Sequence, residues 1–120
     1  MNIPGLTIAR RAEGAIASYS IVTRSATDES LITQAIDGSK LLLGITTIID
    51  SDDGRPTDHI KSGLADVRYG GVVTVDAPLT ADADGNAVVA SSGDYIIGYA
   101  EVPGDEGEIG SVWIVPGVVA

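Results

Sequence analysis

Short runs of β-branched and aromatic residues follow one another along most of the chain, separated by turns rich in Gly and Asp. β-Branched side chains fit the pleated surface of a strand better than the surface of a helix. Gly and Asp favour the tight turns that join strands. The pattern predicts six strands, at residues 19–23, 41–49, 66–69, 71–76, 95–102 and 109–115. We therefore expect an all-β fold, either a small barrel or a sandwich of short strands.

One segment has the start signal of a helix. At residues 27–35, Thr27 stands in a capping position and is followed by Asp28 and Glu29, which suit the positive end of a helix dipole. The segment is predicted as a single short helix, although its β-branched content weakens helical propensity.

The start of the chain is predicted as an extended arm. Residues 1–13 have no full helical period and contain a Pro-Gly pair, which breaks regular structure. Ile3, Leu6 and Ile8 are the apolar anchors with which such an arm would contact another subunit or a partner.

The rest of the chain, residues 14–120, is predicted as a single β domain with an internal repeat. The run at 42–46 matches the run at 96–100, and an acidic turn with Gly follows each of them. We expect pseudo-repeats at 14–63 and 71–117, each ending in a hairpin whose first strand contains a central Gly. Chance similarity between Gly-rich hairpins is the alternative.

The charge distribution limits the choice of partners. Seven basic against seventeen acidic residues make a net charge of −10, which argues against binding nucleic acid or an anionic membrane surface. Residues 1–40 carry four basic and four acidic groups, whereas residues 41–120 carry three and thirteen. An acidic partner would therefore contact the N-terminal third, where Arg10 and Arg11 are adjacent; a solvated tether is the alternative for this pair. The longest nearly apolar run, at 41–49, is too short to span a bilayer.

The sequence contains little that suggests catalysis. There is no Cys, which excludes disulfides, thiolate metal sites and a Cys nucleophile. His59 is the only histidine, and no Gly-x-Ser-x-Gly signature accompanies it. We predict no enzymatic activity and no cofactor.

Two kinds of loop have the appearance of binding sites. The acidic loops at 50–54 and 82–86 place carboxylates at alternate positions, but neither has the Gly and Glu that an EF-hand requires. Asx turns are the simpler interpretation, and an improvised calcium site is the alternative. The glycines at 104–110 are separated by acidic residues that would repel a phosphate, so they are predicted as a hairpin turn.

Trp113 is the only tryptophan and lies among Ile and Val residues. This setting favours packing in the core or in a subunit interface. Stacking against a ligand is the alternative.

From residue 41 to the end, the order of sequence motifs resembles the small capsid decoration, or head cement, proteins of tailed phages. The motifs are residues 43–46, 62–67, 70–74, 78–88 and 96–101, the acidic Gly turn that follows, and residues 112–117 around Trp113. All of them are turns and strands, so the resemblance concerns the fold and the role of the protein rather than individual contacts.

The resemblance implies a structural virion protein, made in the host cytoplasm and bound to the outer surface of the assembled capsid. It implies a homotrimer whose partner is the major capsid protein and whose role is to bridge neighbouring capsid subunits. Ile3, Leu6, Ile8, Arg10 and Arg11 are then the candidate capsid or subunit contacts. The alternative function is a virion-surface carbohydrate-binding module that uses an exposed aromatic such as Trp113 or Tyr95.

Overall fold

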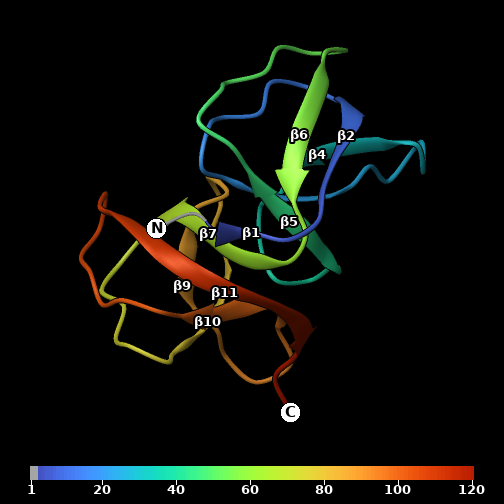
Figure 1. Cartoon of the computed structure of the whole chain (residues 1–120). Helices are drawn as coiled ribbons and strands as arrows, with labels where there is room; N and C mark the ends of the chain where they lie inside the picture. The colour runs from blue at the N-terminus through green and yellow to red at the C-terminus, as the bar shows by residue number, and fades with distance from the viewer. Residues whose placement is uncertain (1–2) are drawn as a thin grey trace.

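The computed structural model describes residues 3–120, which contain strands and turns and no helix (Figure 1). The prediction of an all-β fold is confirmed. The strands are β1 (Ile3–Pro4), β2 (Thr7–Ala12), β3 (Ile21–Arg24), β4 (Leu31–Gln34), β5 (Leu42–Thr46), β6 (Pro56–Ile60), β7 (Gly63–Arg68), β8 (Pro78–Ala81), β9 (Ala87–Val89), β10 (Tyr95–Ala100) and β11 (Ile109–Val118).

Strands β2 to β6 form a closed barrel in the order β2-β4-β3-β5-β6. Strand β2 closes it, because β2 pairs antiparallel with β6 on one side and parallel with β4 on the other. The apolar core cluster of the barrel consists of Ala12, Ile16, Val22, Ile32 and Leu43.

The remaining strands form a six-stranded sheet in the order β1-β7-β11-β10-β8-β9. This sheet curls so that its far side returns toward β7. Tyr69 makes an isolated parallel bridge with Ala87, and the amide of Gly70 donates a 2.8 Å hydrogen bond to the Ala87 carbonyl. Strands β7 to β11 therefore enclose a second core, much as β2 to β6 enclose the first.

The two halves of the chain repeat one topology. The order β4-β3-β5-β6 in the barrel corresponds to β9-β8-β10-β11 in the sheet, and β2 lies beside β6 as β7 lies beside β11. The parallel pairing of β2 with β4 corresponds to the parallel bridge between Tyr69 and Ala87. We call β2 to β6 the first half and β7 to β11 the second half.

Local details repeat as well. Among the described residues, Tyr19 and Asp76 are the non-Gly residues with positive φ, at 52° and 66°, and each follows an isolated bridge at the same place in its half. Matching main-chain hydrogen bonds of 2.8–2.9 Å join Ala12 with Gly54 and Arg55, and Tyr69 with Gly107 and Glu108. The repeated unit thus begins at β2 and at β7, earlier than the sequence alignment places it, because these two strands share little sequence.

The start of the chain differs from the predicted arm. Residues 3–12 are extended, but they lie within the folded domain: β1 pairs with β7, and β2 is a strand of the barrel whose last residue, Ala12, is 1% exposed. The boundary expected at residue 13 therefore falls inside the first half. The reason is that β2 alternates side chains between the barrel interior and solvent, a pattern that Arg10 and Arg11 obscure in the sequence. Residues 1 and 2 of the predicted arm lie outside the described residues.

The predicted helix at 27–35 is wrong, because the segment forms a turn followed by β4. The Asp28 carboxylate accepts hydrogen bonds from the amide and the hydroxyl of Ser30, at 2.9 and 2.6 Å, which lower the pKa of Asp28. The acidic residue that suggested a helix start therefore stabilises an Asx turn. Strand β4 then pairs with both β2 and β3, so sheet pairing overrides the weak local helical signal.

The two halves share one core. Strand β5 of the first half packs against β7, β10 and β11 of the second, and a single cluster of buried apolar side chains includes residues of both halves. Main-chain hydrogen bonds cross the junction from Ile21 to Gly85, from Tyr95 to Gly38 and from Arg68 to Tyr19. The described residues therefore fold as one body. They include no helix of the length and apolarity that crossing a membrane demands.

Candidate docking surface

A row of apolar side chains crosses five strands of the sheet. Ile3 is paired with Leu64, Leu64 with Trp113, Trp113 with Tyr99, and Tyr99 with Pro78. Residues that are directly opposite in antiparallel strands point to the same face of the sheet. The five side chains therefore lie side by side, and we call them the Trp113 row.

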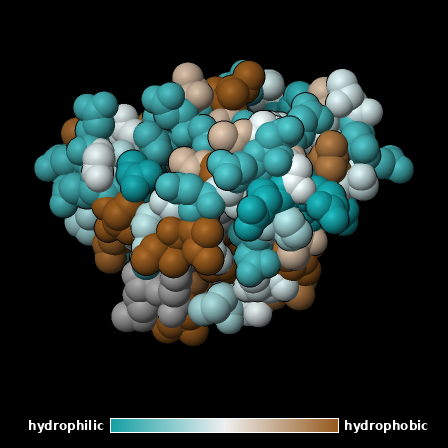
Figure 2. All heavy atoms as spheres, turned by 90° about the horizontal axis from the view of Figure 1, so that it is seen from above, coloured by the Kyte–Doolittle hydropathy of each residue, from teal (hydrophilic) through white to brown (hydrophobic). Residues whose placement is uncertain are grey.

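The Trp113 row is open to solvent. Ile3 is 58% exposed, Trp113 52% and Tyr99 38%, while Leu64 and Pro78 are half-buried. The rings of Trp113 and Tyr99 are 6.4 Å apart and tilted by 44°, within the range of favourable aromatic pairs. Figure 2 shows that hydrophobic side chains gather on part of the molecular surface, below a largely hydrophilic region. Contiguous apolar surface of this kind marks interaction sites on soluble proteins.

The exposure of Trp113 bears on its predicted packing in the core or in a subunit interface. Packing in the core is wrong, because half of the side chain is accessible and the inward positions of β11 belong to neighbours such as Val112 and Ile114. A role for Trp113 in a subunit interface remains a prediction.

An acidic border flanks the Trp113 row on one side. The next residues on the same face are Asp66 on β7, Ser111 on β11, and Glu101, whose amide bonds to the Ser111 carbonyl at 2.9 Å. The Ser111 hydroxyl donates to the Asp66 carboxylate at 3.4 Å. The surface therefore suits a partner with an apolar centre and a basic edge.

The structure brings two of the predicted contact residues together and separates the others. Ile3 and Trp113 belong to the same row, and only Leu64 lies between them. Leu6 is 54% exposed in the link between β1 and β2. Ile8 is half-buried in the barrel, where it pairs with the buried His59.

The two adjacent arginines face different surroundings, as neighbours on a strand must. Arg10 is half-buried and lines an open hollow with Arg24, Glu29 and Ser30 at one end of the first half. The Arg11 side chain is exposed and donates a 2.9 Å hydrogen bond to the Gly54 carbonyl. The two side chains therefore do not form a single basic patch.

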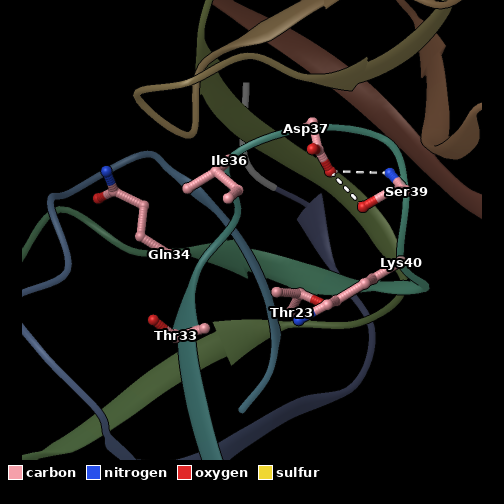
Figure 3. A pocket seen from close by; sticks show the side chains of 7 residues that line it. All are labelled: Thr23, Thr33, Gln34, Ile36, Asp37, Ser39 and Lys40. Atoms are coloured by element: carbon pink, nitrogen blue, oxygen red, sulfur yellow. Dashed lines mark hydrogen bonds between the residues drawn. The ribbon is translucent and has the colours of Figure 1, made fainter. Parts of the chain in front are cut away.

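The first half also has a small pocket of about 170 Å³ beside the loop that joins β4 to β5 (Figure 3). In this loop the Asp37 carboxylate accepts hydrogen bonds from the amide and hydroxyl of Ser39, at 2.9 and 2.6 Å, which lower the pKa of Asp37. The volume is below that of typical small-molecule sites but is sufficient for a side chain or a loop tip. Its lining residues are Thr23, Thr33, Gln34, Ile36, Asp37, Ser39 and Lys40.

His59 does not face a pocket. It is fully buried in the first half, and neither ring nitrogen has a hydrogen-bond partner in the structure. Burial is the main cause that lowers its pKa, the nearby charges of Lys61 and Arg10 act in the same direction, and the Thr57 main chain and Asp58 oppose them. Within residues 3–120, no three His, Asp or Glu side chains are grouped so that they could hold a metal ion.

The carboxylates of the acidic loops bind main-chain amides. Asp50 accepts from Ser18 at 2.7 Å, and Asp53 accepts from Gly14 at 2.8 Å, so both hold the link between β2 and β3. The Asp82 carboxylate accepts from the amides of residues 84 and 86 at 2.9 and 3.0 Å. The Asx turn predicted at 82–86 is present. These carboxylates stabilise the loops by accepting hydrogen bonds from main-chain amides.

Sequence reasoning missed Leu64, Tyr99 and Pro78 as members of the row. Leu64 lies in a strand whose alternate residues are buried, and Tyr99 and Pro78 adjoin three consecutive buried residues. The direction of each side chain depends on register, which the sequence alone leaves open. The available signal was the internal repeat, which aligns Tyr99 with Ile45.

No protein-family model and no curated protein matches this sequence. Among solved structures, the chain is similar to the crystal structure of the head fiber gp8.5 N base of bacteriophage phi29. The TM-score is 0.74 with 22% sequence identity, over 96% of this chain and 98% of that chain. The two chains share one fold.

The likeness to the head fiber base covers nearly the whole of both chains, so it includes both repeated halves. At 22% identity the likeness concerns the fold alone.

Proposed function

We propose that this protein is a structural component of a tailed-phage virion that binds the outer surface of the assembled head. There it stabilises the shell by bridging neighbouring copies of the major capsid protein, as a homotrimer. The observation that carries the proposal is the fold, shared over nearly the full length with a protein described as the base of a phage head fiber. The sequence motifs that resemble decoration proteins support it independently.

The proposed mechanism is passive. The short strands form a closed barrel and a curled sheet, which present fixed surfaces to a partner. Several weak contacts made by one trimer give slow dissociation, because the trimer leaves only when all of them are broken. Bound trimers therefore resist separation of the capsid subunits that they bridge.

The surface proposed for the shell contact is the loop between β5 and β6. Ile48 and Ile49 in this loop are 72% and 69% exposed, which makes them two of the most accessible large apolar side chains of the described residues. Burial of such side chains in an interface contributes roughly 1.5–3 kcal/mol for each one that is fully covered. Of the contacts predicted from the sequence, Ile3, Leu6 and Arg11 are exposed, and Ile3 belongs to the Trp113 row.

The test is co-sedimentation with expanded, undecorated heads of the source phage. Saturable binding at a fixed ratio to the major capsid protein, with heads that then resist heat or chelator better, is the expected result. Protein that stays in the supernatant at every concentration would overturn the proposal.

A carbohydrate-binding module is the second candidate, and the exposed pair of Trp113 and Tyr99 favours it. Exposed aromatic rings are common sugar platforms, although the 44° tilt prevents a single flat stacking face here. Tyr95, the other aromatic considered for this role, packs against the core. Binding on a glycan array that is lost in Trp113→Ser, without binding to heads, would favour this function instead.

A further inference from the structure

The Trp113 row has a counterpart in the first half whose large apolar side chains are buried. The equivalent strands carry Thr7, Ile60, Ile45 and Ile21, paired in the same order as Leu64, Trp113, Tyr99 and Pro78. Ile21 and Ile45 are 0% exposed and Ile60 is 3% exposed, whereas Trp113 is 52% exposed. The same face of one fold is therefore covered in one half and uncovered in the other.

The cover of the first row is the end of the second half. The amide of Ile21 donates a 2.8 Å hydrogen bond to Gly85, and Ile45 and Ile60 belong to the core cluster that includes residues of β7, β10 and β11. Within this chain, a row of this kind packs against the end of another copy of the same fold.

The loop that follows β4 completes the junction. Gly38 fits between Thr80 and Asp94 of the second half so closely that an added Cβ would lie 2.9 Å from the Asp94 Cβ. The Gly38 carbonyl accepts a 2.8 Å hydrogen bond from the amide of Tyr95. The first half thus inserts a loop tip into the end of the second half, beside the buried row.

The matching position at the end of the first half is open. Thr23 is the third residue of β3 as Thr80 is the third residue of β8, and Lys40 lies two residues before Leu42 as Asp94 lies two residues before Ile96 in the aligned repeat. Thr23 and Lys40 line the pocket of about 170 Å³ in Figure 3, where Ile36 and Lys40 reach out from the same loop. Where the second half receives a loop tip, the first half has an unfilled pocket.

The loop that corresponds to the inserted one is not inserted elsewhere in the described residues; its Gly93 amide donates a 2.9 Å hydrogen bond to the Val119 carbonyl, and its Ser92 hydroxyl donates to Ala120 at 3.0 Å. It joins β9 to β10, is exposed at residues 91–93, and contains Gly93 at the place of Gly38, with nothing within 4 Å of an added Cβ. Both sides of one further junction, the row with its loop and the end with its pocket, are therefore present on the surface of a single chain.

Charge favours contact between these two different surfaces over contact between two rows. The pocket is lined by one basic and one acidic side chain, Lys40 and Asp37, and the first half, residues 7–60, carries five basic and eight acidic groups. The row is bordered by the acidic Asp66 and Glu101, in the more acidic second half, where residues 63–118 carry one basic and nine acidic groups. Two rows facing each other would bring two acidic halves together, which is electrostatically unfavourable.

We propose that a second copy of this chain docks head to tail, with the Trp113 row and the 91–93 loop of one copy on the pocket end of the first half of the next. This contact repeats between chains the junction that already joins the two halves within a chain. Such a heterologous interface closes into a ring or continues as a filament, according to its rotation. A ring of three is the form that the proposed homotrimer requires, but the self-association itself does not depend on binding to a phage head.

The test uses two full-length variants and their mixture. Trp113→Ser removes the largest side chain of the row, and Thr33→Tyr fills the pocket from a half-exposed strand position that accepts an aromatic residue. Ile48→Ser removes an exposed apolar side chain outside both surfaces and serves as the matched control. Mass is measured by light scattering and sedimentation over a range of concentrations, and circular dichroism and thermal unfolding report whether each variant is folded. Tyr99→Thr replaces Trp113→Ser if the latter does not fold.

The unmodified protein and Ile48→Ser are expected to assemble, and each interface variant alone is expected to lose the assembled species. An equimolar mixture of the two interface variants is expected to form a heterodimer and nothing larger, because one intact row then meets one intact pocket end. A monomeric unmodified protein, or assembly that survives Trp113→Ser, would overturn the proposal. If Thr33→Tyr assembles normally, or the mixture stays monomeric, the contact is not head to tail. Head binding by a monomer would refute this inference and leave the proposed attachment to heads intact.

Discussion

Ile45 and Tyr99 occupy the same position in the two halves of the chain, yet Ile45 is fully buried and Tyr99 is 38% exposed. Ile45 is paired with Ile21, the first residue of β3, on one side and with Ile60 on the other. Tyr99 is paired in the same way with Pro78, the first residue of β8, and with Trp113. The difference in exposure comes from their neighbours, because the second half covers the first and the described residues hold nothing that covers the second. The change from aliphatic to aromatic side chains coincides with this change in environment.

The stability of the protein is expected to fall in acid because of His59. Its pKa is lowered in the folded state from an ordinary 6.5, so the unfolded chain binds the proton more readily. This contribution is fully present above pH 6.5 and is lost as pH falls below 6.5 toward the lowered folded value. The second half has the buried Val112 opposite Ala100, where the first half has His59 opposite Thr46.

Urea unfolding of the native protein and of His59→Val across the acid range checks this prediction. The variant is expected to lose stability less steeply with falling pH, although removal of the ring costs some packing at neutral pH. Equal pH slopes for the two proteins would contradict it.

The central glycine of each repeated hairpin is expected to be essential for stability. A Cβ on Gly44 would lie 2.5 Å from the carbonyl oxygen of Ile60, and a Cβ on Gly98 would collide with the carbonyl of Trp113. Because the obstacle is backbone, the strands have to move apart, so Gly44→Ala and Gly98→Ala should each cost about 1–3 kcal/mol or more. Gly117→Ala is the control, since its nearest neighbour would be 3.9 Å away. The thermal unfolding midpoints of the three variants measure these costs. An unchanged midpoint for Gly98→Ala would contradict the close approach of the two strands.

Two N-terminal deletions of different length are expected to differ in their effect on folding. Deleting residues 1–5 removes β1 and one member of the Trp113 row but leaves the barrel complete, so the protein should stay folded. Deleting residues 1–12 removes β2, which pairs with both β4 and β6, and should unfold the first half. Near-ultraviolet circular dichroism and the cooperativity of unfolding measure the difference. A well-folded product of the longer deletion would favour the separate arm that the sequence predicts.

Substitution of Ile48 and Ile49 by Ser is expected to weaken attachment to phage heads without changing self-association. Both side chains are exposed on a loop that belongs to neither surface of the proposed head-to-tail contact. Loss of apolar burial at two positions should weaken binding by roughly tenfold or more. Co-sedimentation with heads gives the affinity, and light scattering on the same samples reports the oligomeric state. Unchanged affinity would move the shell contact to another surface.

Local sequence was sufficient to establish that this chain is all-β and where most of its turns lie. β-Branched residues at short intervals, broken by Gly and Asp, specify strands and turns locally, because these preferences depend on each residue and its near neighbours. The similarity of 42–46 to 96–100 also indicated two halves, because a duplicated segment keeps its apolar positions and its glycine at the same spacing. The resemblance to decoration proteins pointed to a phage role through the same motifs.

Which face of each strand is covered depended on the packing of the whole chain. Thr27, Asp28 and Glu29 suggested a helix, but the strand that follows them is stabilised by pairing with residues distant in sequence, which local signals do not report. Residues 7–12 were expected to form an arm because nothing in their sequence identifies the two strands between which they lie. Trp113 and Ile60 stand at matching positions in matching hairpins, and one is exposed and the other buried because one half of the chain covers the other. Burial depends on what packs against a face, so the pattern along a single strand does not separate the core residue from the surface one.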